Sequence, residues 1–98
     1  MAKVKWSNYA LDDMHQIHEF FKRDSLSFAN RLLDRLVQKV DLLEKNPRIG
    51  RKVPEFEDDI IRELFEGNYR IIYRIKSEIL VEVVRIHHSS KPLGRIKK

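Results

Sequence analysis

The sequence predicts an α+β fold in which a helical hairpin packs on one face of a mainly antiparallel sheet. Residues 8 to about 45 repeat apolar side chains every three or four positions, as amphipathic helices do, whereas residues 60–86 alternate with a period of two. The chain has 98 residues, of which 42% are hydrophobic, and this is the size and composition of a domain with one core. We therefore expect a single domain over residues 1–98 with the element order β-α-α-β-β-β.

The chain opens with a short strand and a helix that meet at Ser7. Polar and apolar residues alternate over residues 3–6, which is typical of a strand with one buried face. Ser7 is a favourable N-cap, because its hydroxyl can accept hydrogen bonds from the free amides of a first helical turn. The apolar face of the helix that follows is formed by Ala10, Met14, Ile17 and Phe21.

A second amphipathic helix follows an interruption at residues 22–25. Its apolar stripe consists of Ala29, Leu32, Leu33, Leu36, Val37, Val40 and Leu43. A short connection normally leaves two helices antiparallel, so we expect a hairpin. Pro47 ends it, because the residue before a proline is disfavoured in helical conformation. Residues 46–59 then form a loop, and loops of this length in compact domains tend to be functional.

Three strands are predicted in the remainder of the domain, at residues 60–66, 69–76 and 79–86. They are rich in β-branched and aromatic residues and are separated by turns at Gly67-Asn68 and Ser77-Glu78. In the middle strand the residues expected to face the helices are Tyr69, Ile71, Tyr73 and Ile75. The opposite face of the sheet is expected to be open, and function should be sought there.

Two arginines of the middle strand, Arg70 and Arg74, are predicted to form a basic stripe on that open face. A two-residue turn at Gly67-Asn68 places Phe65 opposite Arg70 and puts Glu63 diagonal to both arginines. A one-residue slip of the register would reverse these faces.

A three-residue turn at residues 76–78 would add Glu82 and His88 to the same surface. The resulting cluster offers cations for phosphate oxygens and a titratable imidazole, which cleavage of an RNA phosphodiester requires. The alternative is that Glu63 and Glu82 only pair with the arginines across strands.

The neighbouring residues are less specific. Arg62 falls on the helix side of the sheet in this register, where its stem could cover apolar surface. His87 and His88 point to opposite faces of a strand and can hardly share one metal ion, and the chain has no Cys. No metal site and no cofactor are predicted.

The positive charge is concentrated in the last third of the chain. Residues 69–98 carry eight basic and two acidic side chains, net +6, whereas the whole chain is +5. This polarity suits a phosphate backbone or an acidic protein partner, and charge alone does not choose between them. Lys91 begins a basic segment, residues 91–98, that is expected to be either a mobile arm or a frayed end.

The absence of Cys, of any apolar run near the roughly 20 residues that span a bilayer, and of a secretion signal predicts a cytoplasmic protein without a membrane partner.

Several segments together resemble the RelE/ParE superfamily of bacterial toxins from type II toxin–antitoxin pairs. They are Val4-Lys5-Trp6-Ser7, the loop Asn46-Pro47-Arg48-Ile49-Gly50-Arg51-Lys52-Val53-Pro54-Glu55, Ile61-Arg62-Glu63-Leu64, Asn68 to Ile75, and Val84-Arg85-Ile86-His87-His88. The resemblance covers nearly the whole chain and implies the same element order as the periodicity. It also implies a growth-inhibiting protein, of the kind associated with plasmid stabilisation, that a small acidic antitoxin neutralises in a hetero-oligomer.

The superfamily splits by mechanism. RelE-like members are mRNA interferases that promote attack of the RNA 2′-hydroxyl in the ribosome, and this resemblance would make Arg70 and His88 catalytic. However, Ile61 and Glu63 stand where RelE has paired lysines, and the terminal tyrosine of some of these nucleases is missing. The loop and the histidine-containing end look more like the ParE branch, whose members poison DNA gyrase.

The leading hypothesis is therefore a ParE-like inhibitor of DNA gyrase, with an mRNA interferase as the alternative and a non-enzymatic nucleic-acid-binding module as the third. The residues predicted to take part in binding are Arg62, Glu63, Arg70, Arg74, Glu82, His87, His88 and Lys91.

Overall fold

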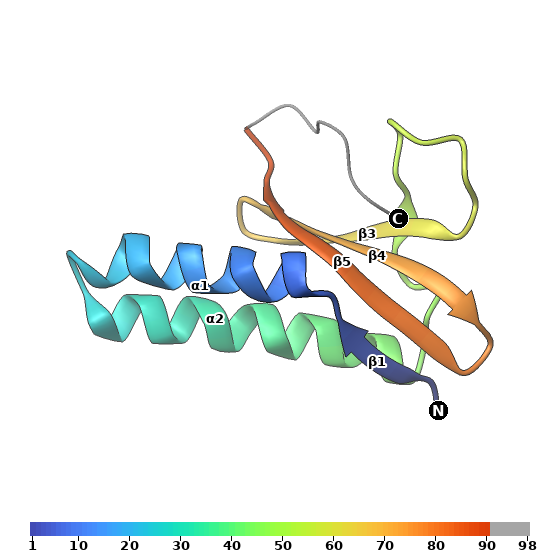
Figure 1. Cartoon of the computed structure of the whole chain (residues 1–98), viewed down its shortest axis with the longest axis horizontal. Coiled ribbons are helices and arrows are strands. Elements are labelled where there is room, and N and C mark those ends of the chain that lie inside the picture. Colours follow the sequence, from blue (N-terminus) through green and yellow to red (C-terminus); the bar gives the residue numbers. More distant parts are fainter. Residues whose placement is uncertain (91–98) are drawn as a thin grey trace.

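The computed structural model describes residues 1–90, and the predicted basic segment 91–98, with Lys91, lies outside them. The predicted α+β class and element order are confirmed, with one additional short strand inside the predicted loop (Figure 1). The elements are β1 (Lys3–Trp6), α1 (Asn8–Lys22), α2 (Leu26–Asp41), the 3-10 helix η1 (Leu42–Glu44), β2 (Arg51–Lys52), β3 (Ile61–Glu66), β4 (Tyr69–Ser77) and β5 (Leu80–His88).

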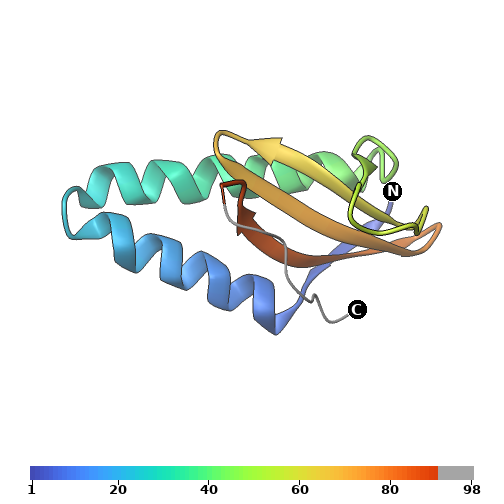
Figure 2. The same ribbon diagram turned by 90° about the horizontal axis from the view of Figure 1, so that it is seen from above.

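Serine residues begin both helices of the hairpin. The Oγ of Ser7 accepts a hydrogen bond from the Ala10 amide at 3.0 Å, and the Oγ of Ser25 accepts one from the Phe28 amide at 3.1 Å. These bonds satisfy amides that would otherwise have no partner in the first turn. The two helices then run side by side along one layer of the molecule (Figures 1 and 2). No helix within residues 1–90 is long and apolar enough to span a membrane.

The sheet has the strand order β1-β5-β4-β3-β2. All neighbours are antiparallel except β1 and β5, which run parallel. The last described strand therefore lies beside the first, and in the register Lys5 is opposite Glu82. Figure 2 shows the strongly twisted sheet with the hairpin on one side of it.

The main core lies between the hairpin and the sheet. The four residues of β4 predicted to face the helices, Tyr69, Ile71, Tyr73 and Ile75, are all buried in it, as predicted. Leu36 of α2 is fully buried against them. Burying an aliphatic side chain of this size contributes roughly 1.5–3 kcal/mol, so this core is what fixes the position of the sheet.

A second, smaller core lies on the opposite face of the sheet, where an open surface was predicted. Val53 of the loop packs there with Ile61 and Ile72, and Phe56 is partly buried against them. The prediction of a wholly open face is therefore wrong. Ile72 and the two loop side chains are apolar, and the loop folds back over this half of the sheet because doing so removes them from water.

The register between β3 and β4 is as predicted, with Phe65 opposite Arg70 and Glu63 opposite Ile72. The register between β4 and β5 differs. Ser77 pairs with Leu80, so the turn consists of residues 78 and 79.

A bulge interrupts β5. Val83 pairs with Tyr73 and Arg85 pairs with Ile72, which leaves Val84 as an extra residue on β5. An extra residue shifts the side-chain alternation of everything after it. The prediction that His88 shares the face of Arg70 is therefore wrong, and Ile86 lies in the main core instead.

Candidate functional site

Arg70 lies in an ion-pair network instead of on an exposed surface. Its Nε donates a hydrogen bond to Glu63 Oε1 at 2.6 Å, and its two terminal nitrogens donate to the Glu55 carboxylate at 2.7 and 2.8 Å. Such a bidentate arginine–carboxylate pair is among the strongest hydrogen-bond geometries in proteins. Arg70 is only 7% exposed. The prediction that it belongs to an exposed basic stripe is wrong, because the loop brings Glu55 over it.

Glu63 of β3 is the most buried member of this network. It is 1% exposed, and its second oxygen accepts a hydrogen bond from Arg51 Nε at 2.7 Å. Of the two hypotheses for Glu63, a place in a reactive cluster or an ion pair with Arg70 across the strands, the structure supports the ion pair. We call Arg51, Glu55, Glu63 and Arg70 the ion-pair cluster. Two positive and two negative side chains leave it without net charge.

The pair formed by Glu55 and Arg70 keeps its charges over a wide pH range. Hydrogen bonds from Arg70 lower the pKa of Glu55 to about 2, against the opposing effect of desolvation. The Glu55 carboxylate in turn raises the pKa of Arg70 above its usual value. Glu55 therefore takes up a proton only in strong acid.

The loop that carries Glu55 is fastened to β4 by Tyr73 and Gly50. The Tyr73 hydroxyl accepts a hydrogen bond from the Gly50 amide at 2.9 Å and donates one to the Pro47 carbonyl at 2.7 Å, and burial raises its pKa. A Cβ at Gly50 would lie 2.5 Å from the carbonyl oxygen of Glu63 and 2.6 Å from the Tyr73 hydroxyl. Only glycine lets the loop approach the sheet this closely.

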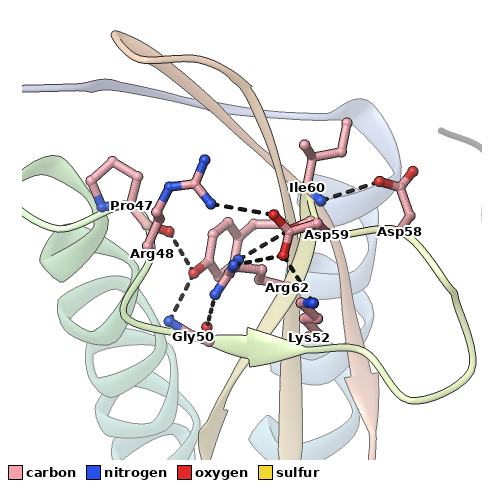
Figure 3. Close-up of polar contacts among 9 residues, drawn as sticks. Pro47, Arg48, Gly50, Lys52, Asp58, Asp59, Ile60 and Arg62 are labelled. Carbon is pink, nitrogen blue, oxygen red and sulfur yellow. Dashed lines mark hydrogen bonds and ion pairs between the residues drawn. The ribbon is translucent and has the colours of Figure 1, made fainter.

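Arg62 holds the same loop from the helix side of the sheet, the side on which it was predicted. It donates to the Gly50 carbonyl at 3.0 Å and to Asp59, whose carboxylate also lies 3.6 Å from Arg48 and 3.3 Å from Lys52 (Figure 3). Hydrogen bonding to Lys52 is the largest effect that lowers the pKa of Asp59. Arg62 thus stabilises the loop, and its predicted role in binding stays untested.

Arg74 differs from Arg70, although both lie on the same face of β4. Within residues 1–90 no hydrogen bond or ion pair engages its guanidinium, and its Nε is buried without an acceptor. Glu82 lies opposite Arg74 in the strand register, but its carboxylate forms an ion pair with Lys76, with Oε1 3.7 Å from Nζ. The predicted common face of Arg74 and Glu82 is thus observed.

The two histidines of β5 exchange their predicted places. His87, not His88, pairs with Arg70 on the face of the ion-pair cluster. The His88 ring packs edge-on against Tyr69 with centroids 5.2 Å apart, on the helix side, and its Nδ1 lies 2.6 Å from the Ser90 Oγ. Arg70 and His88 therefore do not form one catalytic pair.

Asp13 and Arg85 form a site that the sequence interpretation missed. Both carboxylate oxygens of Asp13 accept hydrogen bonds from Arg85, at 2.8 and 2.9 Å, and one also accepts from the Ile86 amide. This joins α1 to the edge of β5 beyond the end of β1 and borders a groove of about 550 Å³ that Phe20, Tyr69 and His88 also line. The available hint was the position of Asp13 three residues after Ala10, where helical spacing places it beside the apolar stripe.

Within residues 1–90 no group of three or more His, Cys, Asp or Glu side chains could hold a metal ion. The site thus consists of a neutral ion-pair cluster at one end of a sheet face and an unpaired Arg74 at the other.

A two-helix hairpin on a five-stranded, mainly antiparallel sheet with this element order is the fold of RelE/ParE-type toxins. Residues 4–93 match the model of the family described as ParE toxin of the type II toxin–antitoxin system, parDE. The chain belongs to this family, and the predicted membership of the RelE/ParE superfamily is confirmed.

Individual relatives agree with this assignment. Toxin ParE1 of Mycobacterium tuberculosis is 31% identical over 75 residues, which is 76% of each chain. The fold is similar to that of a chromosomal ParDE toxin–antitoxin system from P. aeruginosa, with a TM-score of 0.76 and 21% identity over 90% of this chain and 96% of the other. It is also similar to the RelBE2 toxin–antitoxin complex of Mycobacterium tuberculosis, with a TM-score of 0.66 and 24% identity over 89% and 96%.

Proposed function

We propose that this toxin arrests bacterial growth by binding DNA gyrase through protein contacts, without cleaving a phosphodiester. The observation that carries the proposal is the pairing of Arg70 with Glu55 and Glu63. Family membership supports gyrase as the target, because the resemblance to the ParE branch implies it. Gyrase is a cytoplasmic enzyme, so we place the activity there.

The argument against cleavage is electrostatic. A guanidinium stabilises a pentacovalent phosphate only if its N–H donors can reach the phosphate oxygens. Three of the five donors of Arg70 are directed at carboxylates, and a phosphate that approached it would meet the negative charge of Glu55. His88, the expected acid–base residue, lies across the sheet.

The test is a supercoiling assay with purified gyrase and the purified chain, together with a cleavage assay on ribosome-bound mRNA. We expect inhibition of supercoiling or trapped cleaved DNA, and intact messages. Unaffected gyrase at a large excess of toxin contradicts the proposal.

A second candidate function, mRNA cleavage, has one observation in its favour. His87 pairs with Arg70 across β4 and β5, so an imidazole and a guanidinium share the face of the cluster. This arrangement would become competent only if Glu55 moved away. Glu55→Gln should then create or increase mRNA cleavage, whereas the gyrase proposal predicts that this variant leaves messages intact.

We also propose that a small acidic antitoxin neutralises this chain and that it covers the hairpin. Large apolar side chains are exposed along both helices, among them Leu11, Phe20, Leu26 and Val37. Exposed apolar side chains that gather on one part of a surface are typical of sites that bind another protein. Co-expression of the acidic protein from the neighbouring reading frame should restore growth, and Phe20→Ser combined with Leu26→Ser should reduce that rescue. Equal rescue of the variant contradicts this placement.

A further inference from the structure

A group of four basic side chains gathers at the end of the sheet face that the loop leaves uncovered. Lys3 and Lys5 lie on β1, and Val4 and Trp6 between and beyond them pack into the main core, so the two lysines point to the opposite face. In the strand register Lys5 lies opposite Glu82 of β5, and Glu82 lies opposite Arg74 of β4. We call Lys3, Lys5, Arg74 and Lys76 the cation row.

Few acidic side chains lie among the cations of the row. Glu82 is the only acidic residue of β1, β4 and β5, so four cations meet one carboxylate and the net charge is +3. Lys76 is the one member that forms an ion pair, with Glu82 at 3.7 Å. Within the part of the chain that the structure describes, no hydrogen bond or ion pair engages Lys3, Lys5 or Arg74. Their charges are therefore available to an external anion.

Arg74 makes the strongest case for a ligand. It is partly buried, which costs rotational freedom and hydration, yet none of its five N–H donors has an acceptor among residues 1–90. A buried donor without a partner is uncommon in native proteins. Arg74 and Lys5 are two strands and therefore roughly 10 Å apart, and an anion bound beside them could accept hydrogen bonds from the terminal nitrogens of Arg74.

We propose that the cation row binds the phosphate backbone of double-stranded DNA. Acidic protein segments usually add apolar or aromatic anchors to their charges, and single-stranded nucleic acid is bound largely by stacking on aromatic rings. The row contains neither kind of anchor, and the exposed aromatic residue of this face, Phe65, lies at the other end opposite Arg70. Charges spread over three strands without anchors fit a backbone that presents phosphates and no apolar groups.

The proposal does not depend on gyrase as the target, because it concerns binding of free duplex. The probe is a fluorescently labelled 30-base-pair duplex of random sequence, titrated with the full chain and followed by anisotropy at several salt concentrations. Neutralising about four phosphate charges predicts a slope of log Kd against log salt of about 3 to 4. The triple variant Lys3→Gln/Lys5→Gln/Arg74→Gln should weaken binding about tenfold or more and lower that slope by about 3.

The matched control removes three positive charges from the helical hairpin, as Arg23→Gln/Arg31→Gln/Arg35→Gln, and should change binding less than about threefold. Glu82→Gln should tighten binding, because it removes the only carboxylate of the row. A cooperative urea-unfolding transition for each variant checks that the variant is folded.

Equal losses in the two triple variants would overturn the proposal in favour of a general charge effect. Tighter binding of a single-stranded oligonucleotide, or of poly-glutamate with the same number of charges, would overturn it in favour of the corresponding partner. Absence of salt-dependent binding overturns it directly, and gyrase inhibition by the triple variant would show that the two proposals are separate.

Discussion

Arg70 and Arg74 are four residues apart on the same face of the same strand, yet they have opposite environments. Arg70 is enclosed by the loop and bonded to Glu55 and Glu63, whereas Arg74 lies beyond the loop without a partner. Strand periodicity assigns a residue to a face, but the loop decides whether that face meets water. The comparison separates a stabilising arginine from one that is available for binding.

The largest effect is expected from Glu63→Gln. The substitution keeps the shape of the side chain but leaves Arg51 and Arg70 beside a neutral group in a buried position. Breaking a buried ion pair in this way should lower the free energy of unfolding by about 3 kcal/mol. Urea denaturation measures it, with Glu82→Gln at the other end of the face as the control, where the change should stay within about 0.5 kcal/mol. Similar losses for the two variants would show that the cluster is not special.

The second largest loss of stability is expected from Gly50→Ala, because the substitution pushes the loop away from the sheet. The new methyl group would meet the backbone oxygen of Glu63 and the Tyr73 hydroxyl. Overpacking against backbone of this kind costs about 2 to 3 kcal/mol. Tm by circular dichroism reports the loss. Gly67→Ala serves as the contrast: nothing lies near its Cβ, and the cost comes only from its positive φ of 56°. An unchanged Tm for Gly50→Ala would mean that the loop does not need this contact.

Glu55→Gln should have a smaller effect that depends on pH. The pKa of Glu55 is near 2 in the folded chain, below its ordinary 4.5, so the ion pair contributes stability above about pH 4.5 and loses it as the pH falls toward 2. Because the Glu55 side chain is 40% exposed, the contribution is about 1 kcal/mol at neutral pH. The difference in unfolding free energy between wild type and variant should therefore be smaller at pH 3 than at pH 7. A constant difference across that range contradicts the assignment.

The smallest effect on stability is expected from Arg74→Gln. No described residue bonds this guanidinium, so its removal should change the free energy of unfolding by less than about 0.5 kcal/mol, or stabilise the chain by relieving repulsion within the cation row. Arg70→Gln, measured in the same way, is the matched comparison and should be clearly destabilising. A destabilised Arg74 variant would reveal an internal partner and weaken the case for DNA binding.

The sequence predicted the elements better than their contacts. The apolar period located both helices, and Gly67-Asn68 fixed the turn and register between β3 and β4. The bulge at Val84 was missed, because an extra valine in an apolar strand leaves the pattern of residue types unchanged. The prediction for His88 then failed by one residue, the amount by which the alternation shifts.

The site was less predictable than the fold. Arg70, Arg74, Glu63 and Glu82 were assigned to the correct face, but Glu55 entered only as part of a family-like loop motif. Its meeting with Arg70 depends on Val53, Phe56 and Gly50 together, which bring the loop onto the sheet. Such an encounter between residues 15 positions apart leaves no periodic trace in the sequence.

The position of β5 has a consequence for synthesis of the toxin. Although it is the last described strand, it lies between β1 and β4, and Ser7 of the first turn bonds the carbonyl of Val84, 77 residues away. The β1 segment therefore has no place in the sheet until β5 has left the ribosome, several seconds after β1 itself at about 5–20 residues per second. A nascent chain that stops before residue 80 would lack the strand that joins β1 to the rest of the sheet, so the complete sheet forms only late in synthesis.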